Sequence, residues 1–274
     1  MDADTRLHRL VEAVTASSKY HDLAEELIRD IGSRELAKYP HLQTAIKATK
    51  TKLHQVAGVY LSGREPYAAW LSELRTAYAS GETEMVKSAS IPIMRHHAST
   101  RERLPILDEF FARTLSSLPP IRSCLDVACG LNPLAVPWMS LAPLAEYFAY
   151  DVVTDMTGFL TDFFAIPQVA ARVHGSVQAR DVISSPPSES ADVALLLKTI
   201  PCLEQVDKEA GRRLLHGLNA RYLLISFPRR SLGGKKKGME NHYSARLAEI
   251  TAETSWSITR FDFASELAFL VAKW

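Results

Sequence analysis

The sequence predicts an α/β fold in which a mostly parallel, Rossmann-like sheet of seven strands follows an all-helical N-terminal region. In the first third of the chain, apolar residues recur at three- and four-residue spacing, which is typical of helices. From Leu125 onward, short apolar runs alternate with helical patterns, as they do in a parallel sheet. The run Asp192–Leu197 is apolar at almost every position, which indicates a central strand covered on both faces.

The composition is that of an ordinary globular protein. The chain has 274 residues, of which 47% are hydrophobic and 23% charged, and its formal net charge is +1. This length predicts one domain of about 150 residues with a smaller companion. No apolar run is long enough to cross a bilayer, and the N-terminus lacks the apolar segment of a signal peptide. We therefore expect a cytoplasmic protein that is not bound to a membrane.

Residues that could bind a metal ion are few and poorly spaced. Cys124, Cys129 and Cys202 form no CxxC pair, and the adjacent His96 and His97 have no matching ligand at a useful distance in the sequence. We expect neither a metal site nor disulfides. The cysteines are interpreted as small buried apolar residues in a reducing compartment.

The N-terminal third predicts several short helices. Gly32 is expected to end one helix, and Pro40 and Pro66 to begin two others. No segment here alternates with the period of two that a strand requires. We predict a helical domain over residues 1–95 without an active site of its own, followed by the sheet domain over residues 96–274.

A helix from about Ser99 to Leu118 is expected between these two regions. Ser99 or Thr100 can cap its N-terminus, and Pro119 ends it before the first strand. Arg103 would lie close to this N-terminus, where a free carboxylate can dock on unpaired N–H groups. The alternative for Arg103 is a surface salt bridge.

The stretch from Leu125 to Asp151 is the centre of the predicted site. It contains LDVACGLNPLAVPWM and EYFAYD, which predict a strand, a tight turn, a helix and a second strand. Asp151 follows Gly130 by about twenty residues, the spacing at which an acidic residue binds ribose hydroxyls in nucleotide-binding units. The turn has one glycine where GxGxxG has three, which favours an adenosine ligand without a diphosphate, such as S-adenosylmethionine (SAM). A turn that binds no ligand is the alternative.

The remaining strands continue the alternation. Gln178–Val182 is expected to be a short strand with Asp181 near its end, and Tyr222–Phe227 a fifth strand. Trp256–Phe263 and Leu267–Lys273 are expected to form a terminal antiparallel hairpin. Ligand groups then fall at the carboxyl ends of the strands, the pattern of a class I SAM-dependent methyltransferase.

Positive charge is concentrated in two segments. Residues 36–64 carry five basic residues and no acidic one, and residues 221–246 carry seven basic residues against Glu240 alone. Two basic segments beside a cofactor fold indicate a surface that binds phosphates. Each segment taken alone can also be a solvated helix face or loop.

Several motifs together resemble one known family. HHASTRERLP, LDVACGLNPLA, YDVVTDM, RDV, LLLKTIPCLEQ and ISFPRRSLGGKKKGME are similar to segments of the aminoglycoside-resistance 16S rRNA (guanine-1405-N7)-methyltransferases, especially those of aminoglycoside-producing actinomycetes. The resemblance covers essentially the whole chain. It implies a SAM-dependent enzyme that methylates N7 of a decoding-site guanine of 16S rRNA in the assembled 30S subunit. Nothing in the sequence suggests an obligate dimer, so we expect a monomer.

The residues that follow the fourth strand agree with such a target. N7 of guanine has a free lone pair and no proton to remove, so the reaction needs positioning and exclusion of water but no general base. Enzymes that methylate exocyclic amines commonly have an Asn/Asp-Pro-Pro-aromatic tetrapeptide here, where this chain has Lys198-Thr199-Ile200-Pro201. We predict no catalytic residue. Lys198 is a candidate for positioning guanine O6 or a phosphate, or alternatively for capping the sheet edge.

By position, the resemblance also implies a set of cofactor-binding residues. Ala128 and Gly130 would let the backbone approach the methionine moiety, and Asp151 would bind the ribose. Asp181 and Val182 would flank the adenine. The other candidates are Leu197 and Gln205 beside the sulfonium, Arg103 with His97, Ala98 and Ser99 at the cofactor carboxylate, and Tyr60, which can equally be an aromatic residue of domain packing.

RNA recognition is expected to use both basic segments, with residues 1–95 as an RNA- and ribosome-binding domain. Lysine and arginine contacts to phosphates position the RNA, while its shape and the extrusion of the guanine supply specificity. The candidates are Lys47, Lys50, Lys52, Arg229, Arg230, Lys235, Lys236 and Lys237. Two other functions stay open: a small-molecule methyltransferase, which predicts an apolar lid, and a non-catalytic RNA-binding protein, which predicts no SAM binding.

Overall fold

The structure is a computed structural model that describes residues 2–58, 65–229 and 239–273. Its N-terminal elements are α1 (Ala3–Thr15), α2 (Glu25–Lys38), α3 (Leu42–Ala57), α4 (Tyr67–Ala79), α5 (Thr83–Met94), α6 (Ala98–Arg103), η1 (Leu104–Ile106) and α7 (Leu107–Leu115). The sheet region contains β1 (Ile121–Val127), η2 (Asn132–Trp138), β2 (Leu141–Asp151), α8 (Thr154–Phe164), α9 (Pro167–Ala170), β3 (Val173–Ala179), β4 (Ala191–Leu197), α10 (Thr199–Leu203), α11 (Ala210–Gly217), β5 (Ala220–Pro228), α12 (Met239–Thr251), β6 (Ser257–Asp262) and β7 (Glu266–Ala272).

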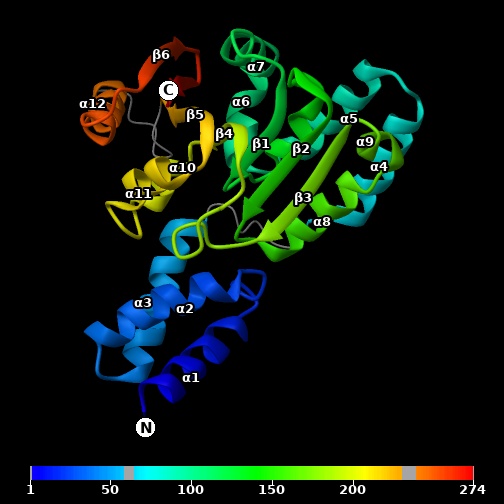
Figure 1. The fold of residues 1–274 in the computed structure, drawn as a ribbon. Coiled ribbons are helices and arrows are strands. Elements are labelled where there is room, and N and C mark those ends of the chain that lie inside the picture. The colour runs from blue at the N-terminus through cyan, green and yellow to red at the C-terminus, as the bar shows by residue number, and fades with distance from the viewer. Residues whose placement is uncertain (1, 59–64, 230–238, 274) are drawn as a thin grey trace.

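A seven-stranded sheet forms the centre of the molecule (Figure 1), with the strand order β3-β2-β1-β4-β5-β7-β6. Strands β1 to β5 pair in parallel, and β7 runs antiparallel to both β5 and β6. The predicted mostly parallel sheet and its terminal hairpin are confirmed. The strand order reverses direction between β1 and β4, and open α/β sheets bind ligands at the carboxyl ends of the strands at such a point.

Helices cover both faces of the sheet. In β4, Val193 and Leu195 belong to a buried cluster that includes residues of α5, α7 and α8, whereas Ala194 and Leu196 belong to a second cluster with residues of α10, α11 and α12. Side chains alternate between the two faces along a strand. The unbroken apolar run of β4 therefore follows from burial on both sides.

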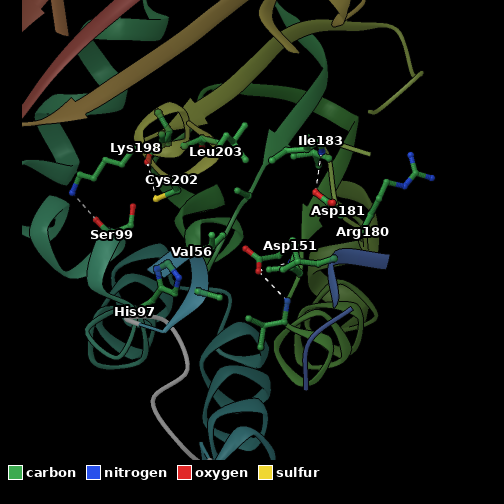
Figure 2. Close-up of a pocket in the computed structure, with 18 residues that line it drawn as sticks. Val56, His97, Ser99, Asp151, Arg180, Asp181, Ile183, Lys198, Cys202 and Leu203 are labelled. Carbon is green, nitrogen blue, oxygen red and sulfur yellow. Dashed lines mark hydrogen bonds between the residues drawn. The ribbon is translucent and has the colours of Figure 1, made fainter. Parts of the chain in front are cut away.

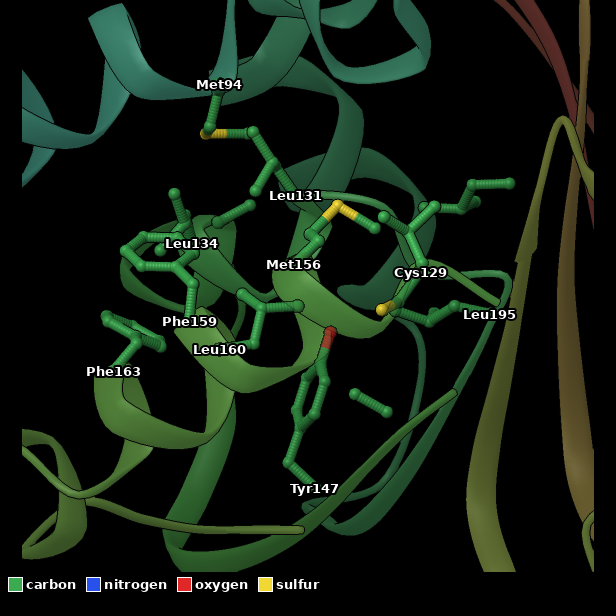
Figure 3. Packing of buried hydrophobic residues seen from close by; sticks show 14 of the residues in the cluster. Met94, Cys129, Leu131, Leu134, Tyr147, Met156, Phe159, Leu160, Phe163 and Leu195 are labelled. Atoms are coloured by element: carbon green, nitrogen blue, oxygen red, sulfur yellow. The ribbon is translucent and has the colours of Figure 1, made fainter. Parts of the chain in front are cut away.

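Figure 3 shows the packing on the first of these faces. Met94 of α5, Leu134 of η2 and Phe159 of α8 meet in one apolar cluster. Tyr147 of β2 is fully buried there, and its hydroxyl donates a hydrogen bond to Oδ2 of Asp126 at 2.6 Å. A buried phenol needs such a partner, because it would otherwise lose its hydrogen bond to water.

The first three helices, α1 to α3, lie at the carboxyl ends of the parallel strands (Figure 1). A short antiparallel bridge joins Leu23, between α1 and α2, to Val153, which follows β2. Beside it, the Ala24 N–H donates to the carbonyl oxygen of Val152 at 2.8 Å. Backbone hydrogen bonds thus attach the N-terminal helices to the loop at the end of β2.

Helices α4 and α5 belong to the predicted N-terminal domain but pack on elements of the sheet domain. Helix α4 packs against α8 and α9, and α5 packs against η2. The domain boundary at residue 95 stays a prediction, because these two helices precede it and yet pack on elements that follow it.

Two turns differ from the sequence-based expectation. Gly32 lies inside α2 instead of ending a helix. Close packing explains the glycine, because a Cβ there would lie 2.5 Å from Cδ2 of Leu10 in α1. The segment after Gly130 forms the 3₁₀ helix η2 instead of an α-helix. Pro133 lies in its first turn, where proline is tolerated, but Pro137 inside it lacks the N–H that an α-helix would use.

Two other elements are shifted or divided. The helix expected from Ser99 to Leu118 is split into α6, η1 and α7, with Pro105 in the short 3₁₀ segment. Neither Ser99 nor Thr100 caps it, because α6 begins at Ala98 and both residues lie inside the helix. The Thr100 hydroxyl donates to the carbonyl oxygens of Met94 and His97. The strand expected at residues 178–182 is β3, which runs from Val173 to Ala179. It ends at Ala179 because its partner β2 ends at Asp151, the residue that pairs with Ala179.

Within residues 2–58, 65–229 and 239–273, no helix is both long and apolar enough to span a bilayer. The same residues contain no group of His, Cys, Asp or Glu side chains arranged to hold a metal ion. Cys124 and Cys129 are buried as expected, and Cys202 is half-buried.

Candidate active site

A pocket opens at the carboxyl ends of β1, β2 and β4, beside the point where the strand order reverses (Figure 2). Parallel strands bring their carboxyl ends to one edge of the sheet, so side chains distant in sequence meet there. Eight of the residues that line it were predicted from the sequence: His97, Ser99, Ala128, Asp151, Asp181, Val182, Leu197 and Lys198.

Asp151 ends β2 and is held by backbone donors. Its Oδ2 accepts a hydrogen bond from the Gly130 N–H at 2.9 Å, and Oδ1 accepts those of Val152 and Val153 at 2.7 and 3.1 Å. Burial raises the pKa of the Asp151 carboxyl, and the three hydrogen bonds oppose that rise. A carboxylate has about four lone-pair sites, so these bonds use both sites of Oδ1 and one of Oδ2, and one site on Oδ2 is left for a ligand donor. The carboxylate is thereby oriented with Oδ2 able to accept a hydrogen bond from a hydroxyl group.

The turn after β1 has two residues with positive φ, Ala128 at 53° and Gly130 at 52°. A Cβ on Gly130 would lie 2.4 Å from Cε1 of His97, so only glycine fits beneath that ring. Ala128 lines the pocket in the same backbone region, which costs a residue with a side chain about 1–2 kcal/mol. Burial and nearby cations lower the pKa of His97, so its imidazole is neutral at pH 7.

Asp181 lies beyond the end of β3, next to the apolar side chain of Val182. Its Oδ1 accepts the Ile183 N–H at 3.0 Å, and its Oδ2 accepts the Ser184 hydroxyl at 3.0 Å. Burial raises the pKa of Asp181, and these hydrogen bonds oppose the rise. A carboxylate beside an apolar wall suits a flat ring that carries an amine at its edge.

Arg103 lies behind the pocket wall, not in it. Its side chain is fully buried, with Nε 3.0 Å from Oε1 of Glu266 and Nη1 donating to Oδ1 of Asn132 at 3.1 Å. The guanidinium also lies 5.0 Å from the ring centre of Phe110. The alternative of a surface salt bridge is wrong, because both members of the ion pair are buried.

Lys198 joins the same buried cluster from the end of β4. Its Nζ lies 2.8 Å from Oε2 of Glu102 and 3.0 Å from Oε1 of Glu266, and it donates to the carbonyl oxygen of Ser99 at 3.0 Å. Burial alone would raise the pKa of Glu266, but the charges of Arg103 and Lys198 hold it below its ordinary value. The carboxylate is therefore ionised at neutral pH.

The other predicted cofactor residues do not line the pocket. Ala98 and Gly130 are buried behind its wall, and Gln205 is exposed outside it. Tyr60 lies outside the described residues.

The predicted RNA-binding residues fall into two groups. Lys47 of α3 is exposed, and Lys50 and Lys52 are half-buried. In the part of the chain that the structure describes, no carboxylate forms an ion pair with these three lysines. Arg229, by contrast, lies 2.6 Å from Oε1 of Glu240 and donates through Nη1 to the carbonyl oxygen of Phe263 at 2.8 Å. Arg230, Lys235, Lys236 and Lys237 lie outside the described residues.

Sequence reasoning missed the contribution of the N-terminal helices to the pocket. Leu27 of α2 and Val56 and Ala57 of α3 line it. In the sequence these residues belong to apolar helical stripes, and nothing separates them from ordinary core positions. Glu266 was also missed, although one acidic residue at the head of the apolar run ELAFLVA is a usable signal, because a buried carboxylate needs a partner.

Comparison with known proteins agrees with this geometry. The sequence profile described as "Ribosomal RNA methyltransferase (FmrO)" matches residues 16–270. The chain belongs to this family of ribosomal RNA methyltransferases. The expected family and the class I methyltransferase fold are therefore confirmed.

Relatives of known activity and known structure cover nearly the whole chain. A 16S rRNA (guanine(1405)-N(7))-methyltransferase of Frankia casuarinae is 37% identical over 97% of this chain and 93% of its own length. The enzyme of that name from Micromonospora rosea is 35% identical over 98% of both chains. Among solved structures, the 16S rRNA methyltransferase RmtF in complex with S-adenosyl-L-homocysteine has a TM-score of 0.78 and 31% identity, with 100% of both chains covered. The methylase RmtB has a TM-score of 0.76 and 27% identity, with 97% of this chain and 98% of its own covered.

Proposed function

We propose that this protein transfers a methyl group from SAM to N7 of guanine 1405 of 16S rRNA. The observation that carries the proposal is the pocket at the strand ends, where Asp151 and Asp181 are fixed by backbone and hydroxyl donors in a chain of this methyltransferase family. The two carboxylates occupy the ends of neighbouring strands, β2 and β3, as binding of a ribose and an adenine requires.

The residues of the pocket fit this cofactor. Asp151 would accept a hydrogen bond from a ribose hydroxyl, and Asp181 would accept one from the exocyclic amine of the adenine. Leu27, Val56 and Val182 supply the apolar surface that a purine ring requires. When bound, SAM supplies an electrophilic methyl group on a sulfonium centre.

The protein's own part in the reaction is to bind, orient and exclude water. Guanine N7 carries no proton, so the reaction requires no general base among the residues of the pocket. The ammonium of Lys198 is already held by Glu102, Glu266 and the Ser99 carbonyl oxygen. Its contact with guanine O6 or a phosphate stays a prediction, and its present contacts support a role in organising the end of the sheet.

The RNA partner would be bound beside this pocket. Helix α3 carries Lys47, Lys50 and Lys52, and its last turn supplies Val56 and Ala57 to the pocket lining. One helix thus connects a basic surface with the cofactor site. This arrangement favours an RNA substrate over a small molecule. We propose that the substrate is the assembled 30S subunit, that the protein acts as a cytoplasmic monomer, and that the modification confers aminoglycoside resistance.

The decisive test is methylation of purified 30S subunits with tritiated SAM, followed by mapping of N7-methylguanine in 16S rRNA. We expect label at guanine 1405 with the wild-type protein and at most a trace with Asp151→Ala. Label at another nucleotide would refute the proposed target. Retention of SAM without any label on RNA would favour a small-molecule substrate, and failure to bind SAM in calorimetry would favour the non-catalytic alternative.

A further inference from the structure

Glu266 is a fully buried carboxylate at the start of β7, a strand whose other residues are apolar. It lies 163 residues from Arg103 in the sequence. It contacts both Arg103, behind the pocket wall, and Lys198, which lines the pocket. We propose that Glu266 is a positioning residue of the cofactor site, which holds both ends of the short helix α6 against the sheet. The inference rests on the proposed function, because α6 and the residue before it form one wall of the pocket.

The first connection reaches the N-terminal end of α6 through Lys198. The Lys198 ammonium lies 3.0 Å from Oε1 of Glu266 and donates to the Ser99 carbonyl oxygen at 3.0 Å, as Figure 2 shows for the second contact. Ser99 and His97 line the pocket at this end of the helix. Glu266 therefore acts on the wall through an ammonium that it orients.

The second connection reaches the other end of α6 directly. Arg103 is the last residue of the helix, and its Nη2 donates to Oε2 of Glu266 at 3.2 Å while Nε lies 3.0 Å from Oε1. Two contacts between one guanidinium and one carboxylate fix orientation as well as distance. A single carboxylate on the terminal hairpin thus joins both ends of α6.

Helix α6 depends on these contacts because it has little stability of its own. It contains six residues, and no side chain caps its N-terminus. Isolated helices shorter than about 12 residues are marginal in water. The helix then ends in the 3₁₀ segment that contains Pro105. Its position must come from tertiary contacts, of which those to Glu266 are fully buried.

The charges make Glu266 hard to replace. Arg103 and Lys198 are both buried, and the one other carboxylate that contacts either of them among the described residues is Glu102, whose side chain is 36% exposed. Loss of the shared carboxylate would leave Arg103 without its paired anion and Lys198 with the partly exposed Glu102 alone, so we expect α6 to shift.

The test compares Glu266→Gln and Glu266→Asp with Phe269→Leu in the full-length protein. Phe269 is also buried in β7, but its ring packs on Phe227, away from α6. SAM affinity is measured by calorimetry at a temperature where all variants are folded. Hydrogen exchange of the amides of residues 100–103 gives a readout that needs no cofactor.

We expect Glu266→Gln to raise the Kd for SAM at least tenfold and to accelerate exchange in α6, and Glu266→Asp to recover part of both. Phe269→Leu should lower the Tm without either change. Wild-type SAM affinity with normal exchange in folded Glu266→Gln would overturn the inference. If Glu266→Gln fails to fold, Lys198→Met tests the link to Ser99 with the Arg103 pair intact, and an unchanged Kd in that variant would overturn the inference.

These outcomes are separable from those of the proposed function. The proposed function is tested with the wild-type protein, by its SAM binding and by the label that it transfers to 30S subunits. The ratio between variant and wild type, together with exchange in α6, reports the role of Glu266.

Discussion

The molecule places its positive charges in two contrasting settings. In and behind the pocket wall, Lys198 and Arg103 are buried and share the carboxylate of Glu266. On α3, Lys47 is exposed and Lys50 and Lys52 are half-buried, and no described carboxylate pairs with these three lysines. The first set is satisfied within the protein, whereas the second is available to a partner.

The difference follows from the cost of removing a charge from water. A buried cation must have an anion at hydrogen-bond distance, so it determines the positions of its neighbours. A cation on the surface keeps its hydration and most of its freedom until a phosphate approaches. Buried cations should therefore affect stability and the cofactor site, and surface cations should affect RNA binding and its salt dependence.

The largest effect is expected from Arg103→Met. The variant removes the guanidinium from Glu266 and Asn132, and breaking a buried ion pair typically costs about 3–5 kcal/mol. Urea unfolding measures the loss, and calorimetry should show weaker SAM binding in the fraction that folds. A loss below about 1 kcal/mol would contradict the view that this charge is structural.

A pH-dependent effect is expected from Asp126→Asn. Burial raises the pKa of Asp126 to about 7, against opposing hydrogen bonds from Tyr147 and Asn132. The folded protein therefore binds more protons than the unfolded chain between about pH 4 and pH 7, and this carboxyl makes the wild type less stable as pH rises through that window. At pH 8 the variant should be more stable than wild type by about 1–3 kcal/mol, with the difference vanishing near pH 4. Thermal unfolding across this range measures it, and a difference independent of pH would contradict the assignment.

A smaller effect, confined to RNA binding, is expected from Lys47→Gln, Lys50→Gln and Lys52→Gln combined. Binding to 30S subunits should weaken about tenfold or more, and the slope of log affinity against log salt should become shallower by about 2, because fewer phosphates are neutralised. The free energy of unfolding should change by less than about 0.5 kcal/mol, and SAM affinity should not change. Lys87→Gln, at a lysine that pairs with Glu84, is the matched control. Equal loss of SAM binding would show that α3 supports the pocket through these lysines.

The smallest effect is expected from Arg229→Gln, which lies between the two settings. Its side chain is 29% exposed and pairs with Glu240, and such pairs contribute about 0–1 kcal/mol. The salt slope of subunit binding should stay that of wild type. A shallower slope would instead place Arg229 among the phosphate contacts predicted from the sequence.

The sequence by itself determined the sheet, the family and part of the pocket. Continuous apolar runs such as that of β4 indicate burial on both faces, and a single acidic residue at a strand end, such as Asp151, lies at the edge where parallel strands gather. These are local signals, because the apolar run of a strand and the acidic residue at its end are adjacent in the sequence. The same reasoning failed at Gly32 and in the helix before β1, where packing and proline decided the outcome.

Only the tertiary structure decided which distant residues meet. Arg103 was interpreted as a cofactor ligand or a surface ion pair, but it is buried against Glu266 from the other end of the chain. Leu27 and Val56 line the pocket because backbone hydrogen bonds bring the N-terminal helices to the end of β2. A charged residue or an apolar stripe in a sequence indicates that a partner is needed if the residues become buried. The partner is chosen by packing, because burial makes an unpaired charge or an uncovered apolar face too costly to keep.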